Sequence, residues 1–214
     1  MAEKGIFISF EGTEGAGKST QIQLLNDELV KRGYDVLLTR EPGGTDIGDQ
    51  ISHMVKYYTG EEGIAEEAEV LLFAASRAQL VKKRLLPHLE KGGIVICDRF
   101  ADSTEAYQGY GRGIDRERIQ DLISYATSGL MPDVTLLLDL SIEKGMARVG
   151  KRAVTEDEKN DRIEAAGREF HENVRRGFLE IAKRDTGRVS VIDADQSIEG
   201  IQQDVLKVID HVFA

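Results

Sequence analysis

Short apolar runs alternate with amphipathic helical patterns along the whole chain. Five apolar runs bounded by glycine or polar residues are typical of buried strands, at residues 6–10, 36–38, 94–97, 134–140 and 189–192. Ile22, Leu25 and Leu29 fall on one helical face after the first run, and apolar residues recur at helical spacing from Ile198 to Val212. Strands this short and apolar require helices on both faces. The pattern therefore predicts an α/β fold with a five-stranded parallel sheet.

The chain length and the polar segments limit the domain organisation. A chain of 214 residues is long enough for one α/β domain with a proper core and too short for two. We therefore expect a single domain over 1–214. Residues 150–160 are polar and charged without apolar periodicity, which predicts a mobile loop. In parallel sheets of this kind ligands bind beyond the carboxyl ends of the strands, so the residues that directly follow strands are the first candidates.

Composition excludes several classes of protein. The net charge of -10 disfavours general nucleic-acid binding, which requires a basic surface. A single cysteine, Cys97, rules out an intrachain disulfide and lies in an apolar run, so we expect it in the core. The four histidines lack metal-ligand spacing and are expected at the surface. The first residues lack the long apolar segment of a signal peptide, and no later apolar run is long enough to span a bilayer, so we expect no membrane partner and a cytoplasmic location.

A phosphate-binding loop follows the first apolar run. Residues 12–19 match G-x-x-x-x-G-K-[ST], with a predicted strand before the motif and a predicted helix after it. Backbone N–H groups and the helix N-terminus would cradle phosphates, Lys18 would neutralise the β- and γ-phosphates, and the Ser19 hydroxyl would ligate Mg²⁺. The motif predicts a P-loop NTPase fold. The expected ATP-binding residues are Gly12, Thr13, Glu14, Gly15, Ala16, Gly17, Lys18, Ser19 and Thr20.

Four further segments separate kinases from the other P-loop classes. The N-K-x-D tetrapeptide by which GTPases read guanine does not occur. The informative segments are R-E-P-G-G-T at 40–45, L-L-F-A-A-S-R at 71–77, D-R-F at 98–100 and S-T-E-A-Y-Q-G-Y-G-R-G at 103–113. In this order, and together with the P-loop, they resemble the thymidylate kinase family from about residue 6 to the C-terminal helix. The resemblance implies a homodimeric enzyme that phosphorylates dTMP with ATP and Mg²⁺ as the cofactor.

The resemblance also implies an acceptor site. Phe73 and Arg77 are four residues apart and share a helical face, so one can stack on a planar base while the other donates hydrogen bonds to its edge. The alternative is a core phenylalanine and a solvated arginine. In the family the matching aromatic residue stacks on thymine and the matching arginine contacts a base carbonyl. The full set of dTMP-binding residues implied is Glu41, Phe73, Arg77, Arg99, Thr104, Tyr107 and Gln108.

Two charged residues end the third strand. Asp98 can hold Mg²⁺ through water, and Arg99 can clamp the acceptor phosphate with two parallel hydrogen bonds, which lysine cannot do. A capping aspartate and a surface arginine are the alternative reading. Glu11 precedes the P-loop and either helps to position Mg²⁺ or the acceptor, or is a strand-end carboxylate.

A lid of about residues 148–164 is expected to supply a further cation. Residues 13–16 contain no arginine, and 161–164 resemble the D-R-x-E of the family, which indicates the bacterial type with a catalytic arginine in the lid. Arg152 is the first choice, with Arg148, Lys151 and Arg162 as alternatives. We therefore expect Lys18, Arg99 and Arg152 to be catalytic. Competing hypotheses are a kinase for another monophosphate or for a deoxynucleoside, and a nucleotide switch that signals to a protein partner.

Overall fold

The computed structural model describes residues 5–150, 161–164 and 166–213. Its centre is a five-stranded sheet in the order β2-β3-β1-β4-β5, in which all four strand pairings are parallel. The strands are β1 (Ile6–Glu11), β2 (Val36–Arg40), β3 (Ile94–Asp98), β4 (Val134–Asp139) and β5 (Val189–Asp193). The predicted fold class and all five predicted strands are confirmed, with ends shifted by at most two residues.

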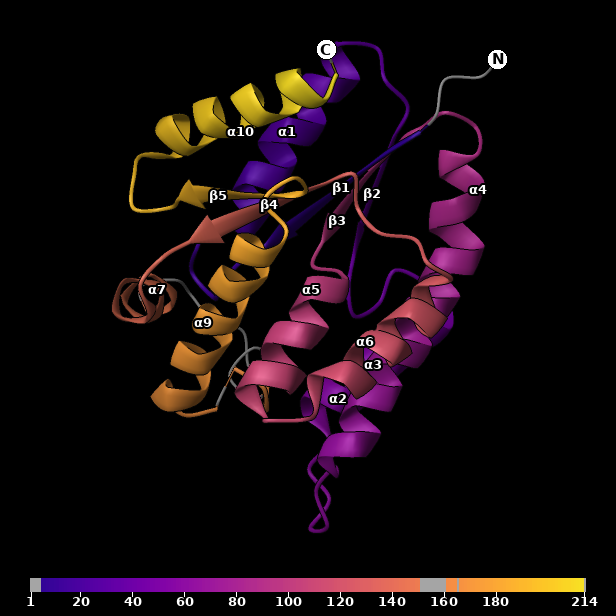
Figure 1. Cartoon of the computed structure of the whole chain (residues 1–214), viewed down its shortest axis with the longest axis vertical. Coiled ribbons are helices and arrows are strands. Elements are labelled where there is room, and N and C mark those ends of the chain that lie inside the picture. The colour runs from indigo at the N-terminus through magenta and orange to yellow at the C-terminus, as the bar shows by residue number, and fades with distance from the viewer. Residues whose placement is uncertain (1–4, 151–160, 165, 214) are drawn as a thin grey trace.

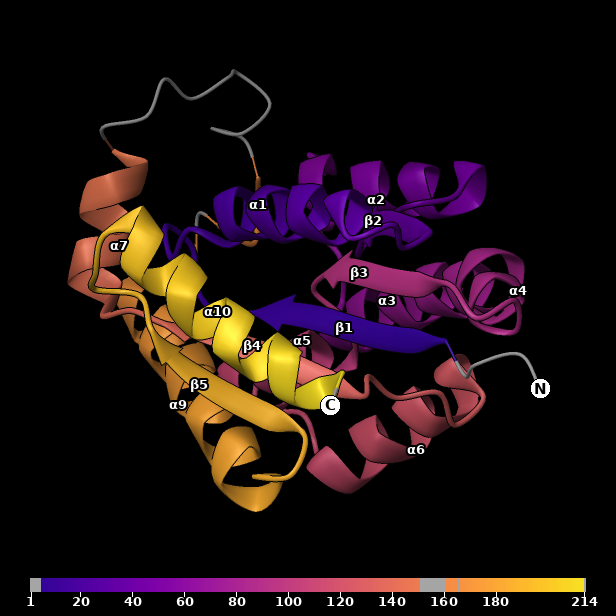
Figure 2. The ribbon, with the colours of Figure 1, turned by 90° about the horizontal axis from the view of Figure 1, so that it is seen from above.

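Helices cover both faces of the sheet. Figure 1 shows α1 (Lys18–Lys31) and α10 (Ile198–Val212) on one face and the remaining large helices on the other. The second face carries the helices α2 (Asp46–Tyr57), α3 (Glu66–Leu80), α4 (Leu86–Leu89), α5 (Ala101–Thr104), α6 (Arg116–Thr127) and α9 (Arg168–Arg184). Two π-helical segments, η1 (Val81–Leu85) and η2 (Glu105–Gly111), continue α3 and α5. Figure 2 shows the sheet from above, with β2 and β5 at opposite edges.

The alternation of side chains along β1 separates two cores. Ile8 and Phe10 belong to a cluster with α1 and α10, whereas Phe7 belongs to a cluster with α3, η1, α5 and α6. Successive strand residues point to opposite faces, so a single apolar run serves both layers. Cys97 is buried in the second cluster, as predicted.

Two local predictions were wrong. The segment 36–38 was expected to be a buried strand, but β2 lies at the sheet edge and Leu38 is exposed because only β3 pairs with it. His171 was expected at the surface, but it is buried on α9. It precedes Val174, Phe178 and Ile181 at helical spacing on the inner face of that helix. This apolar stripe would have predicted the burial of His171.

The carboxyl ends of β1 and β3 lie side by side, because Phe10 pairs with Asp98. The P-loop leaves β1 at this edge and the D-R-F segment leaves β3, so the fold brings the two motifs together. No helix among the described residues is long and apolar enough to cross a bilayer.

Candidate active site

The P-loop wraps around the Lys18 side chain at the start of α1. The ammonium of Lys18 donates hydrogen bonds to the carbonyl oxygens of Gly12, at 3.0 Å, and Thr13, at 3.1 Å. Burial, followed by the nearby positive charge of Arg99, lowers the pKa of Lys18 to about 8. An arriving phosphate would reverse this shift, since a negative charge favours the ammonium form. The lysine is therefore held ready for an anion.

A close backbone approach joins the P-loop to α7 (Ile142–Val149). Gly15 has φ of +71°, and a Cβ there would lie 2.4 Å from the carbonyl oxygen of Gly145. Any larger residue at either glycine would push the two segments apart. The contact sets Arg148 at the end of α7. Its guanidinium donates to the carbonyl oxygens of Gly15, at 3.3 Å, and Ala194, at 3.0 Å, bridging the P-loop and the loop after β5.

One open cavity beside the P-loop brings together every residue that we expected to bind dTMP. Its empty volume, open solvent included, is about 640 Å³. It is lined by the seven predicted acceptor residues Glu41, Phe73, Arg77, Arg99, Thr104, Tyr107 and Gln108, and also by Glu14, Pro42, Lys56, Phe100, Ser103, Asp161, Ile163, Glu164 and His171. The shared cavity supports a common role for residues that lie up to 67 positions apart in the sequence.

Arg77 forms one wall of this cavity and is only 2% exposed. Its Nε and Nη2 atoms contact Oε2 of Glu41 at 2.8 and 2.6 Å, Nη1 donates to Oγ1 of Thr104 at 2.8 Å, and Nη2 donates to the carbonyl oxygen of Phe100 at 3.0 Å. A guanidinium has five N–H groups, so one on Nη1 remains for a ligand. Arg77 is thus not a solvated charge, and one of its N–H groups has no partner among the described residues. Phe73, one turn earlier, is only partly buried where it lines the cavity.

Arg99 lies between the P-loop and the acceptor cavity. Its backbone adopts φ of 68°, a left-handed conformation rare for a residue other than glycine. Nη1 donates to Oγ of Ser103 at 3.2 Å, and the guanidinium lies over the ring of Tyr107 at 5.0 Å. The strained backbone is consistent with a side chain held for a function.

Glu11 holds the loop that carries Arg99. Its buried carboxylate accepts hydrogen bonds from the backbone N–H groups of Phe100, at 2.8 Å, and Ser103, at 3.3 Å, and from the Ser103 hydroxyl, at 2.6 Å. Burial, then the negative charge of Asp102, raises the pKa of Glu11 to about 7. These contacts make Glu11 a strand-end carboxylate, the second of the two alternatives considered from sequence, and show that it holds the D-R-F loop.

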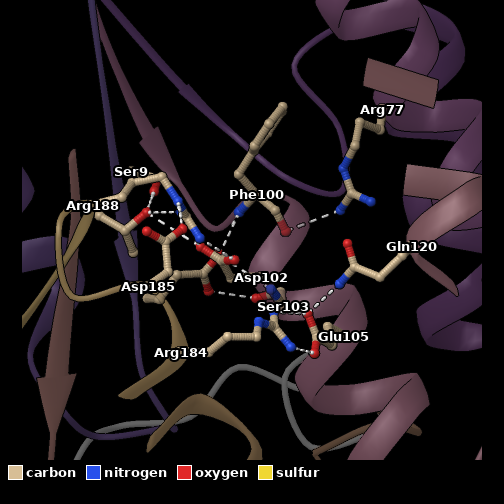
Figure 3. A network of polar contacts seen from close by, with 12 residues as sticks. Ser9, Arg77, Phe100, Asp102, Ser103, Glu105, Gln120, Arg184, Asp185 and Arg188 are labelled. Carbon is tan, nitrogen blue, oxygen red and sulfur yellow. Dashed lines mark hydrogen bonds and ion pairs between the residues drawn. The ribbon is translucent and has the colours of Figure 1, made fainter. Parts of the chain in front are cut away.

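Two arginines anchor the helix that carries the acceptor residues (Figure 3). Arg188 makes a two-pronged contact with the carboxylate of Asp102, at 2.7 and 2.9 Å, on α5. Arg184 does the same for Glu105 at the start of η2, with both distances 2.7 Å. Both carboxylates are buried, so the Glu105 pair fixes η2 against the end of α9, and the Asp102 pair fixes α5 against the turn between α9 and β5.

The residues proposed for Mg²⁺ are Ser19, which directly follows Lys18 of the P-loop, and Asp98, which ends β3 beside β1. Oδ1 of Asp98 is buried without a hydrogen-bond partner in the described part of the chain, and Ser19 is exposed on the first turn of α1. The described residues contain no group of three or more acidic, histidine or cysteine side chains that would bind a metal on their own. This donor set fits Mg²⁺, which is commonly held by one carboxylate, water and substrate phosphates.

The structure describes two of the four basic residues considered as the lid cation, Arg148 and Arg162. Arg152 and Lys151 lie outside the described residues. Arg162 contacts the Glu69 carboxylate and donates to the carbonyl oxygen of Val55, so here it faces α3 rather than the P-loop. Arg148 contacts the P-loop backbone as described above.

Sequence reasoning missed two acidic sites. Glu69 is a buried carboxylate on α3 that contacts Gln108, Arg112 and Arg162. It lies four residues before Phe73 and eight before Arg77, so helical spacing from the recognised pair would have found it. Glu164 hydrogen-bonds Glu14 of the P-loop, and burial, followed by this hydrogen bond, raises the pKa of Glu164 to about 8. Only the fold shows that contact.

The carboxyl pair predicts a pH-dependent stability. Glu164 titrates near 4.5 when unfolded and near 8 when folded, so the native state keeps a proton that the unfolded state loses. Glu164 therefore lowers the free energy of unfolding. This destabilisation is absent below pH 4.5 and grows as the pH rises to 8. We expect Glu164→Gln to raise the free energy of unfolding by about 1–2 kcal/mol at pH 8, with solvent screening of the partly exposed group limiting the gain.

Thermal unfolding at pH 5 and pH 8 measures this difference. The advantage of Glu164→Gln should be small at pH 5 and about 4 °C in Tm at pH 8. Glu67→Gln, on the exposed part of α3, removes one charge away from the pair and serves as the control. An advantage of Glu164→Gln that is equal at both pH values would contradict the raised pKa of Glu164.

Comparison with known proteins agrees with these motifs. Residues 10–205 match the family model described as thymidylate kinase. A thymidylate kinase from an Exiguobacterium species is 48% identical over 202 residues, covering 94% of this chain and 92% of the relative. One from Roseiflexus castenholzii is 44% identical, covering 98% and 94%. The crystal structure of thymidylate kinase from Ehrlichia chaffeensis superimposes with a TM-score of 0.77 at 35% identity, covering 96% of this chain and 98% of that one.

Proposed function

The chain belongs to the thymidylate kinase family and transfers the γ-phosphoryl group of ATP to dTMP to form dTDP, and we propose that the cavity beside the P-loop is its dTMP site. The observation that carries this assignment is the single cavity lined by all seven expected acceptor residues, with Arg99 on its P-loop side. This activity supplies dTDP for dTTP biosynthesis.

The base is read at the inner end of the cavity. Phe73 stacks on the pyrimidine ring, and the remaining N–H of Arg77 donates to a base carbonyl. Thr104 and Glu41 hold the guanidinium of Arg77 in place. Tyr107 lies along the deoxyribose, and Gln108 faces the base edge.

Phosphoryl transfer here is a matter of positioning and charge. The second pKa of a phosphomonoester is about 6, so the acceptor is already mostly a dianion at neutral pH and needs no general base. Arg99 binds the acceptor phosphate, and Lys18 turns from the carbonyl oxygens of the P-loop toward the β- and γ-phosphates. The residues expected to bind ATP, 12–20, supply backbone N–H groups and the N-terminus of α1. Charge neutralisation and in-line placement then lower the barrier.

Mg²⁺ is the proposed cofactor, with Ser19 and Asp98 as the residues that hold it directly or through water. The unpartnered oxygen of Asp98 supports this role. When bound, Mg²⁺ neutralises charge on the β- and γ-phosphates of ATP.

Removal of the metal gives a direct prediction. EDTA should abolish dTDP formation, and Asp98→Asn should raise the Mg²⁺ concentration for half-maximal rate about tenfold, because a neutral amide attracts hydrated Mg²⁺ less than a carboxylate does. A titration of rate against Mg²⁺ checks this. An unchanged midpoint in Asp98→Asn would remove Asp98 from the metal site.

The lid is proposed to supply the last cation. Arg152 remains the first choice, as in the bacterial type with a catalytic lid arginine. Arg148 is already committed to backbone oxygens and Arg162 to Glu69. Closure of residues 148–164 would exclude water, which competes with dTMP as acceptor.

We also propose a cytoplasmic homodimer built from one kinase domain spanning 1–214. The exposed apolar residues Ile47 and Met54 on α2 and Leu71 on the adjacent α3 support a protein contact on this side of the molecule.

The homodimer predicts a specific disruption. Leu71→Asp places a charge in the proposed contact and should convert the dimer to a monomer in sedimentation velocity runs. Met146→Asp, at an equally exposed position on α7, should leave the dimer intact. Loss of the dimer in both variants, or in neither, would argue against this surface.

The activity is tested by ADP formation from Mg-ATP with dTMP, dUMP, thymidine, dGMP, AMP or no acceptor. We expect strong stimulation by dTMP with dTDP as product and none by thymidine. A deoxynucleoside kinase would show the reverse preference. A nucleotide switch would hydrolyse ATP or GTP slowly with no response to any monophosphate.

A further inference from the structure

Glu69 is a buried carboxylate in contact with three separate segments. It is 1% exposed on α3, one turn before Phe73. Oε1 accepts a hydrogen bond from Nε2 of Gln108 on η2 at 3.0 Å, and Arg112 lies 3.4 Å from both carboxylate oxygens. Arg162, near the C-terminal end of the lid segment, contacts Oε2. The proposed function leaves this carboxylate without a role.

Glu69 is ionised at neutral pH. Burial opposes its charge, but the hydrogen bonds from Gln108 and Arg162 and the charges of Arg112 and Arg162 outweigh burial and lower its pKa. An ionised carboxylate can only accept hydrogen bonds. The NH₂ group of Gln108 must therefore face Glu69, and the opposite orientation of the amide would set two acceptors against each other.

This contact decides which end of the Gln108 amide faces the ligand. Gln108 is 2% exposed and lines the acceptor cavity. Its Oε1 accepts no hydrogen bond from any residue that the structure describes, and it is not among the fully buried unpartnered atoms. The amide thus presents an acceptor to the cavity, while Arg77 presents a donor from the neighbouring wall.

We propose, resting on the assignment of the dTMP site, that Glu69 is a positioning residue that selects bases with an N3–H group by fixing the carbonyl oxygen of Gln108 toward the cavity. Thymine and uracil pair a donor at N3 with an acceptor at O4, which matches Gln108 and Arg77. Cytosine has an acceptor at N3 and an amine at C4, the reverse pattern. A base with the reverse pattern would leave buried polar groups unpaired, which is a strong basis for discrimination.

Glu69→Gln tests the proposal, because a carboxamide can donate as well as accept and no longer fixes Gln108. Three nucleotides separate the effects. dTMP and 5-methyl-dCMP share the methyl group and differ in the donor–acceptor pattern, whereas dTMP and dUMP share the pattern and differ in the methyl group. We expect Glu69→Gln to narrow the preference for dTMP over 5-methyl-dCMP about tenfold, with the preference for dTMP over dUMP unchanged within about twofold.

The preferences are measured as KM for dTMP and dUMP and as the inhibition constant of 5-methyl-dCMP. Equal changes in both preferences would mean general loosening of the cavity and would overturn the proposal, as would no change in either. Glu67→Gln, one charge removed from the exposed part of the same helix, should behave as wild type. Circular dichroism and Tm establish that each variant is folded.

A second variant shows whether Glu69 acts through Gln108. Gln108→Met removes the amide at similar volume and should itself narrow the preference for dTMP over 5-methyl-dCMP. In that background Glu69→Gln should narrow it no further. If the double variant shows a still smaller preference for dTMP over 5-methyl-dCMP than Gln108→Met alone, Glu69 acts on selectivity without Gln108. If the wild-type enzyme does not phosphorylate dTMP, the proposed function fails. If it does, and the variants do not change the preference as expected, only the role of Glu69 fails.

Discussion

Replacement of Arg99 with alanine is expected to lower kcat/KM for dTMP about 1,000-fold, while KM for ATP changes less than about threefold. Arg99 is the cation between the P-loop and the acceptor cavity, held by Ser103 and packed over Tyr107. Its loss removes charge where the transferring phosphoryl group meets the acceptor, and single preorganised donors at such points contribute about 10²–10³ in rate. Initial rates at varied dTMP and ATP concentrations measure both parameters.

Arg99→Lys separates charge from geometry. Lysine keeps the charge but cannot make two parallel hydrogen bonds to a phosphate, so we expect it to recover only part of the lost rate. Arg84→Ala, at an exposed arginine on η1, is the control and should retain wild-type rates. An Arg99→Ala enzyme with near-normal kcat/KM for dTMP would remove Arg99 from the acceptor site.

Arg77→Ala is expected to raise KM for dTMP about 100-fold and to destabilise the fold by about 3–5 kcal/mol. The change in KM follows from loss of the donor to the base. The loss of stability follows because Glu41 would be left as a buried carboxylate without its partner. Burial already raises the pKa of Glu41 despite the charge of Arg77, so without Arg77 it would take up a proton at still higher pH.

The double variant Arg77→Met with Glu41→Gln tests the two effects separately. Removal of both charges should restore much of the stability, measured by urea unfolding, because no buried charge is left unpaired. KM for dTMP should stay high, measured by initial rates. Recovery of dTMP affinity together with stability would mean that Arg77 only supports the fold.

Most of the fold could be predicted from the sequence, because the apolar runs, the helical spacing and the position of the P-loop all indicated the same fold. The apolar runs of β1, β3 and β4 are buried on both faces, and the P-loop has the required strand before it and helix after it. β2 was placed correctly, but its exposure was not predicted, since an apolar run does not reveal whether its strand lies at an edge.

The candidate site was only partly readable. Phe73 and Arg77 share a helical face, and the structure brings them into one cavity with Arg99 and Gln108, which lie far away in the sequence. The contacts that orient these residues escaped prediction. Glu69 could have been found from its spacing to Phe73. In contrast, the pairing of Asp102 with Arg188 and of Glu164 with Glu14 depends on how distant segments pack, which local pattern does not encode.

A crystal structure with bound dTMP tests the assignment of the acceptor site most directly. We expect thymine to stack on Phe73 with a carbonyl oxygen within hydrogen-bond distance of Arg77, and the phosphate to contact the guanidinium of Arg99. dTMP bound outside this cavity, or with its phosphate turned away from Arg99 and the P-loop, would contradict the proposed site.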